Sequence, residues 1–351
     1  MSFAAWQRGS KSGKNSRFLG LAALFVVLGL AGCAAEVDDA IDGIESTSEA
    51  LTLSPRWKVS GGGPVAFSPD SATVATGSPA TRAQLLAAKD GALLKNLTIR
   101  HTANAASFSP DGTLLAVGSG GGGQSLGLRL FRVSDGALLF QASSHSNGTS
   151  AVSYSPKDNN LFASSGGDRT TKLWNTSGTL VRTLNEGTYG KRISAMSFAP
   201  DGNTLASNVS GNIHVWRVAD GTLLLTILGT GGGKGIAYSP DGKLISTGTA
   251  LYDAASGALV RTLAWPSGSV TCTTFTRDGQ AVAVGGEDFP NNVDDATIRF
   301  FKVSTGAELA AYHQLGGASS YVKSIAISPD GASLGYTLAT DLTTAVVASP
   351  F

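Results

Sequence analysis

The stretch that decides the fold is the 40-residue segment His145–Leu184, which reads HSNGTSAVSYSPKDNNLFASSGGDRTTKLWNTSGTLVRTL. It contains four short runs rich in Val, Tyr, Phe, Leu and Thr, each bounded by Pro, Gly, Asn or Asp, and such runs are typical of strands separated by turns. Four consecutive strands joined by short turns predict an antiparallel meander, which needs neighbours of the same kind to bury both faces. The four runs are Ala151–Tyr154, Leu161–Ser164, Thr171–Trp174 and Leu180–Leu184.

A first turn signature, Ser-Pro-Asp-Gly, recurs along the chain and usually follows an aromatic residue. Pro presets φ, Asp suits the next position, and Gly accepts the left-handed conformation that ends the turn, so the tetrapeptide favours a hairpin. From Asp70 to Asp330 there are six intervals, and the mean period is therefore about 43 residues, which is typical of four-stranded propeller blades. The copies, of which the first, third and sixth are degenerate, begin at Ser68, Ser109, Ser155, Ala199, Ser239, Thr276 and Ser328.

A second signature, Asp-Gly-Ala-Leu or a close variant, precedes the last strand of each blade but occurs in six copies only. The seventh blade reaches Phe351 without a fourth strand, while an unassigned strand, Arg56–Val59, precedes the first blade. We predict that this strand becomes the outer strand of the seventh blade and closes the ring. The sequence thus predicts an all-β fold over residues 55–351, a seven-bladed β-propeller of four-stranded antiparallel blades. The six copies begin at Asp90, Asp135, Ser177, Asp220, Ser256 and Thr305.

These features resemble the WD-repeat β-propeller family, and the resemblance covers roughly Pro55 to Phe351. The third repeat carries His145, Ser164, Asp168 and Trp174, which the family's pattern would join in a structural hydrogen-bonding tetrad. The resemblance implies a non-enzymatic scaffold for protein partners. The other repeats depart from the Trp-Asp dipeptide and read Phe131-Arg132, Trp216-Arg217, Tyr252-Asp253 and Phe301-Lys302.

The N-terminal segment has the profile of a signal peptide. Residues 1–32 hold four basic residues and no acidic residue, and their apolar run, Phe18–Ala31, is short for a membrane-spanning helix. The run leads to Leu30-Ala31-Gly32-Cys33, which resembles a bacterial lipobox and implies cleavage before Cys33 and lipidation of its thiol. Since Ala34 follows the cysteine, similarity to sorting in enteric bacteria places the anchored protein in the cell envelope, at the outer membrane.

Residues 33–54 are predicted to be an acidic tether between the lipid anchor and the propeller. Removal of residues 1–32 leaves 22 basic against 25 acidic residues, so the mature chain has a formal net charge of −3. A chain of this charge without a basic stripe is not typical of nucleic-acid binding. We therefore expect protein partners, a membrane anchor and a monomeric propeller.

Three readings that involve chemistry compete with the structural ones. His145, Ser164 and Asp168 are the residue types of a hydrolase triad, but the tetrad also accounts for Trp174 and no nucleophile elbow is present. The acidic loop Gly286–Asp295 holds four carboxylates, yet their spacing matches no calcium motif, so a solvated loop is favoured. A propeller enzyme or a quinone- or metal-binding protein remains the alternative function, although it predicts a tryptophan in every blade. We expect no catalytic residue, cofactor or metal, and we expect Cys272 to be a buried apolar residue.

The predicted strand order also separates two faces of the ring. Because strands alternate in direction, the two turn signatures lie on one face, here called the turn face. The opposite face, here called the link face, carries the second turn of each blade and the irregular links between blades. Irregular loops on a rigid scaffold are common recognition sites. The side chains on that face with the aromatic or guanidinium character of interface anchors are Arg100, Tyr189, Arg192, Trp265 and Phe289.

Overall fold

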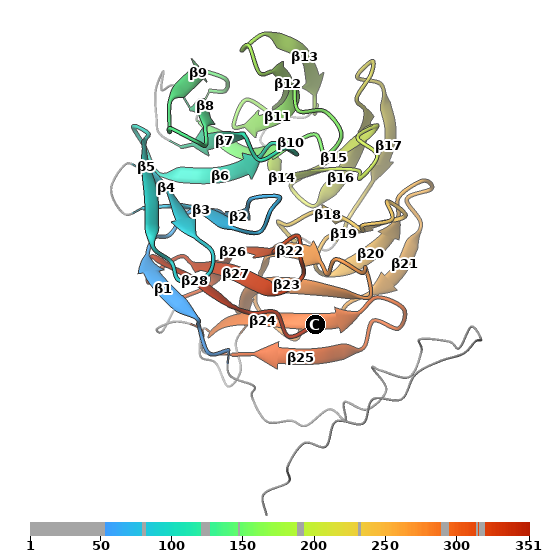
Figure 1. The fold of residues 1–351 in the computed structure, drawn as a ribbon. Coiled ribbons are helices and arrows are strands. Elements are labelled where there is room, and N and C mark those ends of the chain that lie inside the picture. Colours follow the sequence, from blue (N-terminus) through green and yellow to red (C-terminus); the bar gives the residue numbers. More distant parts are fainter. Residues whose placement is uncertain are drawn as a thin grey trace, which may run out of the picture. The chain divides into compact units, whose positions relative to one another are not determined.

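The computed structural model describes residues 53–351, apart from residues 79–81, 121–126, 147, 188–192, 231–232, 289–294, 314 and 316–319. The predicted signal peptide, Cys33 and the tether up to residue 52 lie outside this part. The described residues form 28 strands in seven four-stranded antiparallel sheets (Figure 1). The predicted seven-bladed β-propeller is therefore confirmed.

Each blade runs from an inner strand near the centre of the ring to an outer strand at its rim (Figure 1). Blade 1 consists of β2 (Val65–Phe67), β3 (Thr73–Gly77), β4 (Arg82–Ala87) and β5 (Leu93–Thr98). Blade 2 consists of β6 (Ala103–Phe108), β7 (Leu114–Ser119), β8 (Leu128–Arg132) and β9 (Leu138–Ala142). Blade 3 consists of β10 (Thr149–Tyr154), β11 (Leu161–Gly166), β12 (Thr170–Asn175) and β13 (Leu180–Asn185). Blades 4 to 6 consist of β14 (Ile193–Phe198), β15 (Thr204–Val209), β16 (Asn212–Arg217), β17 (Leu223–Ile227); β18 (Ala237–Tyr238), β19 (Leu244–Ser246), β20 (Ala250–Asp253), β21 (Leu259–Thr262); and β22 (Val270–Phe275), β23 (Ala281–Asp288), β24 (Asp295–Lys302), β25 (Glu308–Tyr312). Blade 7 consists of β26 (Val322–Ile327), β27 (Ser333–Leu338), β28 (Thr343–Ala348) and β1 (Trp57–Ser60).

The first turn of each blade is held by its own side chains. In blade 2, Ser109 Oγ donates to Asp111 Oδ1 at 2.6 Å and accepts from the backbone N–H of Leu114 at 3.0 Å. Gly112 then takes a φ of +72°, as the turn chemistry predicts. In the degenerate first copy Ser71 occupies this place and takes a φ of 60°, so the turn keeps its shape without glycine.

The strand at the start of the propeller closes the ring, as predicted. β1 pairs antiparallel with β28, with Trp57 opposite Val346 and Ser60 opposite Thr343. The indole Nε1 of Trp57 also donates to the Ala88 carbonyl of blade 1 at 2.8 Å, and the side chain is 8% exposed. Burial of an aromatic side chain of this size contributes about 2–3 kcal/mol, so the closure joins blade 7 to blade 1 by packing as well as by pairing.

A glycine contact between neighbouring blades recurs at the rim and includes the closing strand. The second turn signature places Gly178 at a φ of +90°, and a Cβ there would lie 2.3 Å from the Phe140 ring of the preceding blade. Gly91 stands in the same way against Trp57, at 2.8 Å. Trp57 thus takes the place on β1 that Phe140 has on β9. Glycine is required at both turns because a side chain would meet the neighbouring blade and strain the backbone.

The hydrophobic core is divided among the interfaces between blades. Among the described residues, buried apolar side chains form seven clusters, one between each pair of neighbouring blades. The smallest interfaces still bury large groups, such as Phe67 with Trp57 between blades 7 and 1. A blade therefore depends on both neighbours for its core, which is the physical reason why the sequence repeats.

The two faces are separated as the strand order predicts. The first and third turns of one blade meet, since Val133 N donates to the Thr113 carbonyl at 2.9 Å. Neighbouring blades also touch on this turn face, where Asp111 N donates to Asn159 Oδ1 at 3.0 Å. The second turns and the links between blades lie together on the link face, where Arg169 O accepts from Glu186 N at 3.2 Å.

Candidate functional site

The four tetrad side chains of blade 3 form one hydrogen-bonded chain. His145 lies in the link before β10, Ser164 on β11, Asp168 in the second turn and Trp174 on β12. The imidazole Nδ1 of His145 lies 2.7 Å from Asp168 Oδ1, and its Nε2 lies 2.8 Å from Ser164 Oγ. Trp174 Nε1 donates to the same Ser164 Oγ at 2.9 Å. The chain joins the link to two strands of the blade.

Burial decides what this hydrogen-bonded network of four side chains can do chemically. Ser164 is 0% exposed and His145 is 5% exposed, so no substrate atom can reach the hydroxyl although its geometry is that of a Ser-His-Asp triad. Burial lowers the pKa of His145, partly offset by Asp168. Burial alone would raise the pKa of Asp168, but hydrogen bonds from His145, Thr170 and Lys172 bring it below its usual value. The network is structural, because its nucleophile position is sealed inside the blade.

Blade 4 contains a second buried network that the sequence reading missed. The Nδ1 of His214 lies 2.7 Å from Glu186 Oε2. The Glu186 side chain is fully buried, and it also accepts from Trp216 Nε1 at 3.2 Å and from Thr171 Oγ1 of blade 3 at 2.8 Å. In the sequence Glu186 stands out only as the one carboxylate between β13 and β14, which gives no sign of its burial.

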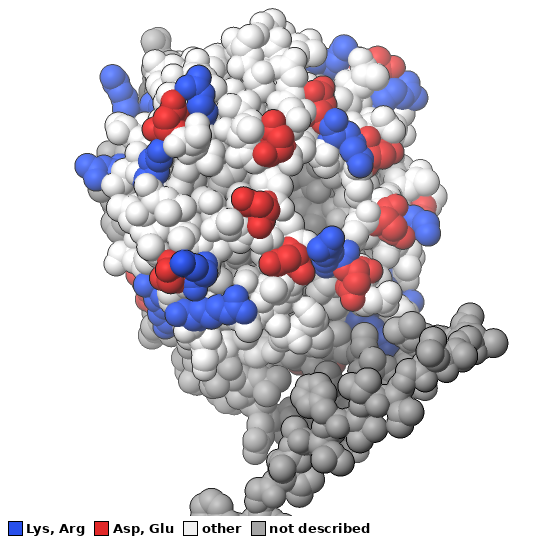
Figure 2. Space-filling model, viewed as in Figure 1, with Lys and Arg blue, Asp and Glu red and all other residues white. Residues whose placement is uncertain are grey.

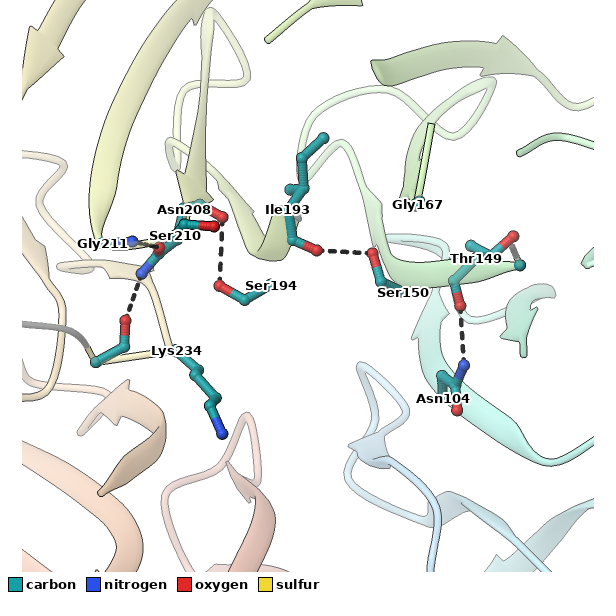
Figure 3. Close-up of a pocket in the computed structure, with 13 residues that line it drawn as sticks. Asn104, Thr149, Ser150, Gly167, Ile193, Ser194, Asn208, Ser210, Gly211 and Lys234 are labelled. Carbon is teal, nitrogen blue, oxygen red and sulfur yellow. Dashed lines mark hydrogen bonds between the residues drawn. The ribbon is translucent and has the colours of Figure 1, made fainter. Parts of the chain in front are cut away.

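A cavity lies on the link face at the mouth of the central channel. It has a volume of about 590 Å³ and is bordered by blades 2 to 5, and Figure 3 shows the side chains around it. Its wall consists of glycines, neutral polar side chains, one isoleucine and one lysine. The described residues with side chains that line it are Asn104, Thr149, Ser150, Ile193, Ser194, Asn208, Ser210 and Lys234.

Side chains on the cavity wall stitch each blade to the next. Asn104 Nδ2 donates to the Thr149 carbonyl at 3.1 Å, and Ser150 Oγ donates to the Ile193 carbonyl at 2.8 Å (Figure 3). Asn208 Nδ2 reaches the Gly233 carbonyl of blade 5 at 2.8 Å. Inner strands are free edges of their sheets, and these bonds satisfy part of the backbone that would otherwise stay unpaired. The wall of the cavity is therefore rigid.

The structure does not bring the five predicted anchor residues together at this cavity. Arg100 is exposed, and its charge together with burial lowers the pKa of Arg129. Trp265 is partly buried: its Nε1 donates to the Glu287 carbonyl at 3.1 Å, and the Arg299 guanidinium lies 5.7 Å from its ring. Trp265 thus covers the end of blades 5 and 6, and neither residue lines the cavity. Tyr189, Arg192 and Phe289 lie outside the described residues.

The expectation of a solvated acidic loop at residues 286–295 needs correction at both ends. β23 and β24 extend to the pair Asp288 and Asp295, which are 2% and 6% exposed. The Arg299 guanidinium compensates the buried Asp288 carboxylate at 2.5 Å, and His313 lies 3.5 Å from Asp295. These carboxylates are thus used inside the blade, while residues 289–294 lie outside the described part.

Other chemistry finds little support in the part of the chain that the structure describes. No group of three or more His, Cys, Asp or Glu side chains there is placed to hold a metal ion. Burial raises the pKa of the Cys272 thiol to about 12, which keeps it protonated and unreactive. The same described residues contain no helix that is long and apolar enough to cross a membrane.

Comparisons with known proteins agree with the repeat pattern. The family model of the WD domain, G-beta repeat, matches residues 136–175 and 178–217. An uncharacterized WD repeat-containing protein of Synechocystis is 35% identical over 120 residues, which is 30% of this chain and 34% of the relative. The intraflagellar transport protein 122 homolog of Danio rerio is 26% identical over 222 residues, 63% of this chain and 14% of the relative. The chain thus spans about a third or less of these relatives' lengths.

The matched units are staggered against the blades. Each starts at the second turn signature and takes in the outer strand of one blade and three strands of the next, β9 to β12 and β13 to β16. This stagger is why the ring needs β1 to complete blade 7. Residues 136–175 and 178–217 of this all-β propeller thus match two copies of the WD40 repeat.

Proposed function

We propose that this protein is a membrane-anchored, non-enzymatic scaffold of the bacterial cell envelope that binds a protein partner through its link face. The observation that carries the proposal is the channel-mouth cavity on that face, whose mostly polar wall includes Lys234 and is joined by hydrogen bonds between blades. The WD40 repeats support the assignment, since propellers with such repeats commonly bind proteins. The buried Ser164 supports a structural use of the one triad-like arrangement.

The contrast between the faces favours the link face as the docking surface. The turn face is built from tight, repeated hairpins whose Ser and Asp side chains are used within the turns. The links differ from blade to blade in length and sequence, and they surround the cavity. Leu228, in the link between blades 4 and 5, is 74% exposed, as suits an apolar contact for a partner.

Crosslinking from defined positions tests the docking surface. A photo-crosslinking amino acid at Arg100, Thr102 or Leu228 would report on the link face, and one at Lys89, Asp135 or Asp220 on the turn face; all six positions are exposed. We expect the same partner band from the link-face positions in intact cells and none from the turn-face positions. A partner band that arises from the turn face alone would overturn the proposal.

The anchor is tested separately by cell fractionation. Lipidation requires the Cys33 thiol, so Cys33→Ala should move the protein from the membrane to the soluble fraction or leave it unprocessed. Cys272→Ala is the matched control, because this partly buried cysteine belongs to β22 of the propeller, and it should leave the distribution unchanged. Mature Cys33→Ala protein that stays in the membrane fraction would refute the lipid anchor.

A further inference from the structure

The inner strands place one equivalent residue per blade at the mouth of the channel. An aromatic residue or isoleucine, such as Phe108 in blade 2, stands directly before each first turn, and the position lies four residues before it. In five blades the pairing with the second strand skips this position, which therefore forms a β-bulge. We call this set the channel ring. Its members are Gly63, Asn104, Ser150, Ser194, Lys234, Thr271 and Lys323.

Four of the ring residues, Asn104, Ser150, Ser194 and Lys234, line the cavity. The same register puts Thr271 and Lys323 at the corresponding level of blades 6 and 7, outside the lining of that cavity. Every member except Gly63 is at least partly exposed.

The two lysines are held at the ring in different ways. The backbone N–H of Lys234 donates to the Val270 carbonyl at 3.1 Å, so its side chain is not needed to join the blades. Figure 3 shows that side chain extending away from the strands toward the open centre. Lys323 Nζ donates to the Gly62 carbonyl at 2.9 Å and keeps two further N–H donors. Burial lowers the pKa of Lys323, which reflects the cost of a cation in the channel wall.

The charge of the ring is unbalanced. It contains two cations and no acidic residue, and the two cations stand on either side of blade 6. Across the described residues no ion pair joins Lys234 or Lys323 to a carboxylate. By contrast, Lys172 and Arg299, which lie on the third strands of blades 3 and 6, each form an ion pair with an aspartate. An anion at the channel mouth would gain two charge-assisted hydrogen bonds without displacing an internal partner.

We propose that the channel ring binds a carboxylate of an acidic segment of the protein partner, with Lys234 and Lys323 as its counter-charges. The inference rests on the proposed function, since it specifies what the link face recognises. The ring lacks arginine, whose planar fork is the usual bidentate partner of phosphate. Figure 2 shows the turn face, opposite the channel ring; its basic side chains lie in small groups with acidic ones and form no broad basic area that would suit a nucleic acid.

The binding test uses a fluorescein-labelled peptide of alternating Gly and Glu residues and a matched Gly-Gln peptide, with the full-length chain in mild detergent. Fluorescence anisotropy at low salt should show binding of the Glu peptide only. Lys234→Gln with Lys323→Gln should weaken it at least about tenfold, since a hydrogen bond to a charged group contributes on the order of a tenfold change in affinity or more. Lys234→Arg with Lys323→Arg should retain binding.

The matched control is Lys89→Gln with Lys157→Gln, which removes two exposed lysines from the turn face. It should change binding less than about twofold, because the same net charge is lost away from the ring. Equal binding by both double variants, or equal binding of the Gln peptide, would overturn the inference. Stronger competition by inorganic phosphate than by acetate would also overturn it, because the ring would then be a phosphate site.

The crosslinking experiment separates the two proposals. If link-face crosslinks persist at full strength in the Lys234→Gln, Lys323→Gln variant, the docking surface stands and the carboxylate inference falls. If the partner crosslinks only from the turn face, the proposed function falls, and the peptide measurement decides the ring by itself.

Discussion

Blades 3 and 4 are neighbours in sequence and in space, yet they hold the same tryptophan in two different ways. Trp174 and Trp216 have equivalent places on the third strand, opposite Phe162 and Leu205. Trp174 donates to Ser164 of its own blade, whereas Trp216 donates to Glu186 from the link. Strand register thus fixes the donor, but the acceptor can come from a strand or from a link. In blade 4 the acceptor also joins two blades, since Thr171 of blade 3 bonds Glu186.

We expect the largest loss of stability when Glu186, the acceptor of the blade 4 network, is removed. Glu186→Ala would leave Trp216, His214 and Thr171 without their shared acceptor inside the protein. We expect a loss of about 3–5 kcal/mol in the free energy of unfolding, since each buried donor left without an acceptor costs about 1–3 kcal/mol. Urea unfolding followed by tryptophan fluorescence measures it. Glu186→Gln, which keeps an acceptor oxygen, should lose less. A loss below about 1 kcal/mol for the alanine variant would show that the link network contributes little.

The corresponding change in blade 3 should cost less. His145→Ala removes two hydrogen bonds from a buried ring, and we expect a loss of about 2–3 kcal/mol. Asp168 keeps Thr170 and Lys172 as partners, at 2.9 and 3.2 Å, and is partly exposed, so it is not stranded. The same urea measurement orders the two variants. If His145→Ala were the more damaging change, the hydrogen-bond network confined to blade 3 would contribute more to the free energy of unfolding than the network that joins blades 3 and 4.

A smaller effect separates two tyrosines at the ends of inner strands. The Tyr238 hydroxyl lies 3.1 Å from Thr204 Oγ1, whereas the Tyr154 hydroxyl is buried and has no hydrogen-bond partner among the described groups. Tyr154→Phe should therefore raise the unfolding free energy by about 1 kcal/mol and Tyr238→Phe should lower it by a similar amount. Thermal unfolding of the two variants side by side checks the opposite signs. Equal signs would mean that Tyr154 has a partner after all.

The smallest expected effect is a pH dependence that belongs to blade 3. Because burial lowers the pKa of His145 below its ordinary 6.5, the unfolded chain takes up a proton before the folded one does as the pH falls. Stability should therefore decline as the pH drops through about 6.5, and His145→Gln should remove part of that decline. Urea unfolding at several pH values measures the slope. An unchanged slope in the variant would assign the pH dependence to other groups.

Much of the architecture follows from local chemistry and is accessible from sequence. The turn signatures fix where hairpins occur, because Pro and Gly restrict the backbone in a way that tertiary contacts rarely override. The closure by β1 also followed from local signals, since one blade lacked a strand and one strand lacked a blade. The network of His145, Ser164, Asp168 and Trp174 was instead expected from the resemblance to WD-repeat proteins, and the structure contains it.

The site was harder to foresee because it depends on contacts between blades. Nothing in the link itself indicates that Glu186 turns inward to His214, since its partners belong to two other strands. The role of Trp265 as an interface anchor stays a prediction; its loop position did not indicate that its Nε1 donates to the Glu287 carbonyl or that its ring is partly buried. The channel ring was available in the sequence as one position in every copy. The residue type at this position varies and is not part of a turn signature, so turn and strand patterns do not reveal it.

The closing strand also has a consequence for the order in which the chain folds. β1 is made early, but its partner β28 is synthesised only after all the strands of blades 1 to 6. Until then β1 cannot pair, and blade 7 and blade 1 both lack one side of their shared core. Pairing over such a sequence separation is slow, and it leaves strand edges exposed to wrong partners in the meantime. The completed ring thus forms in a late step, and a chain that stops before β28 would remain open however well its other blades have folded.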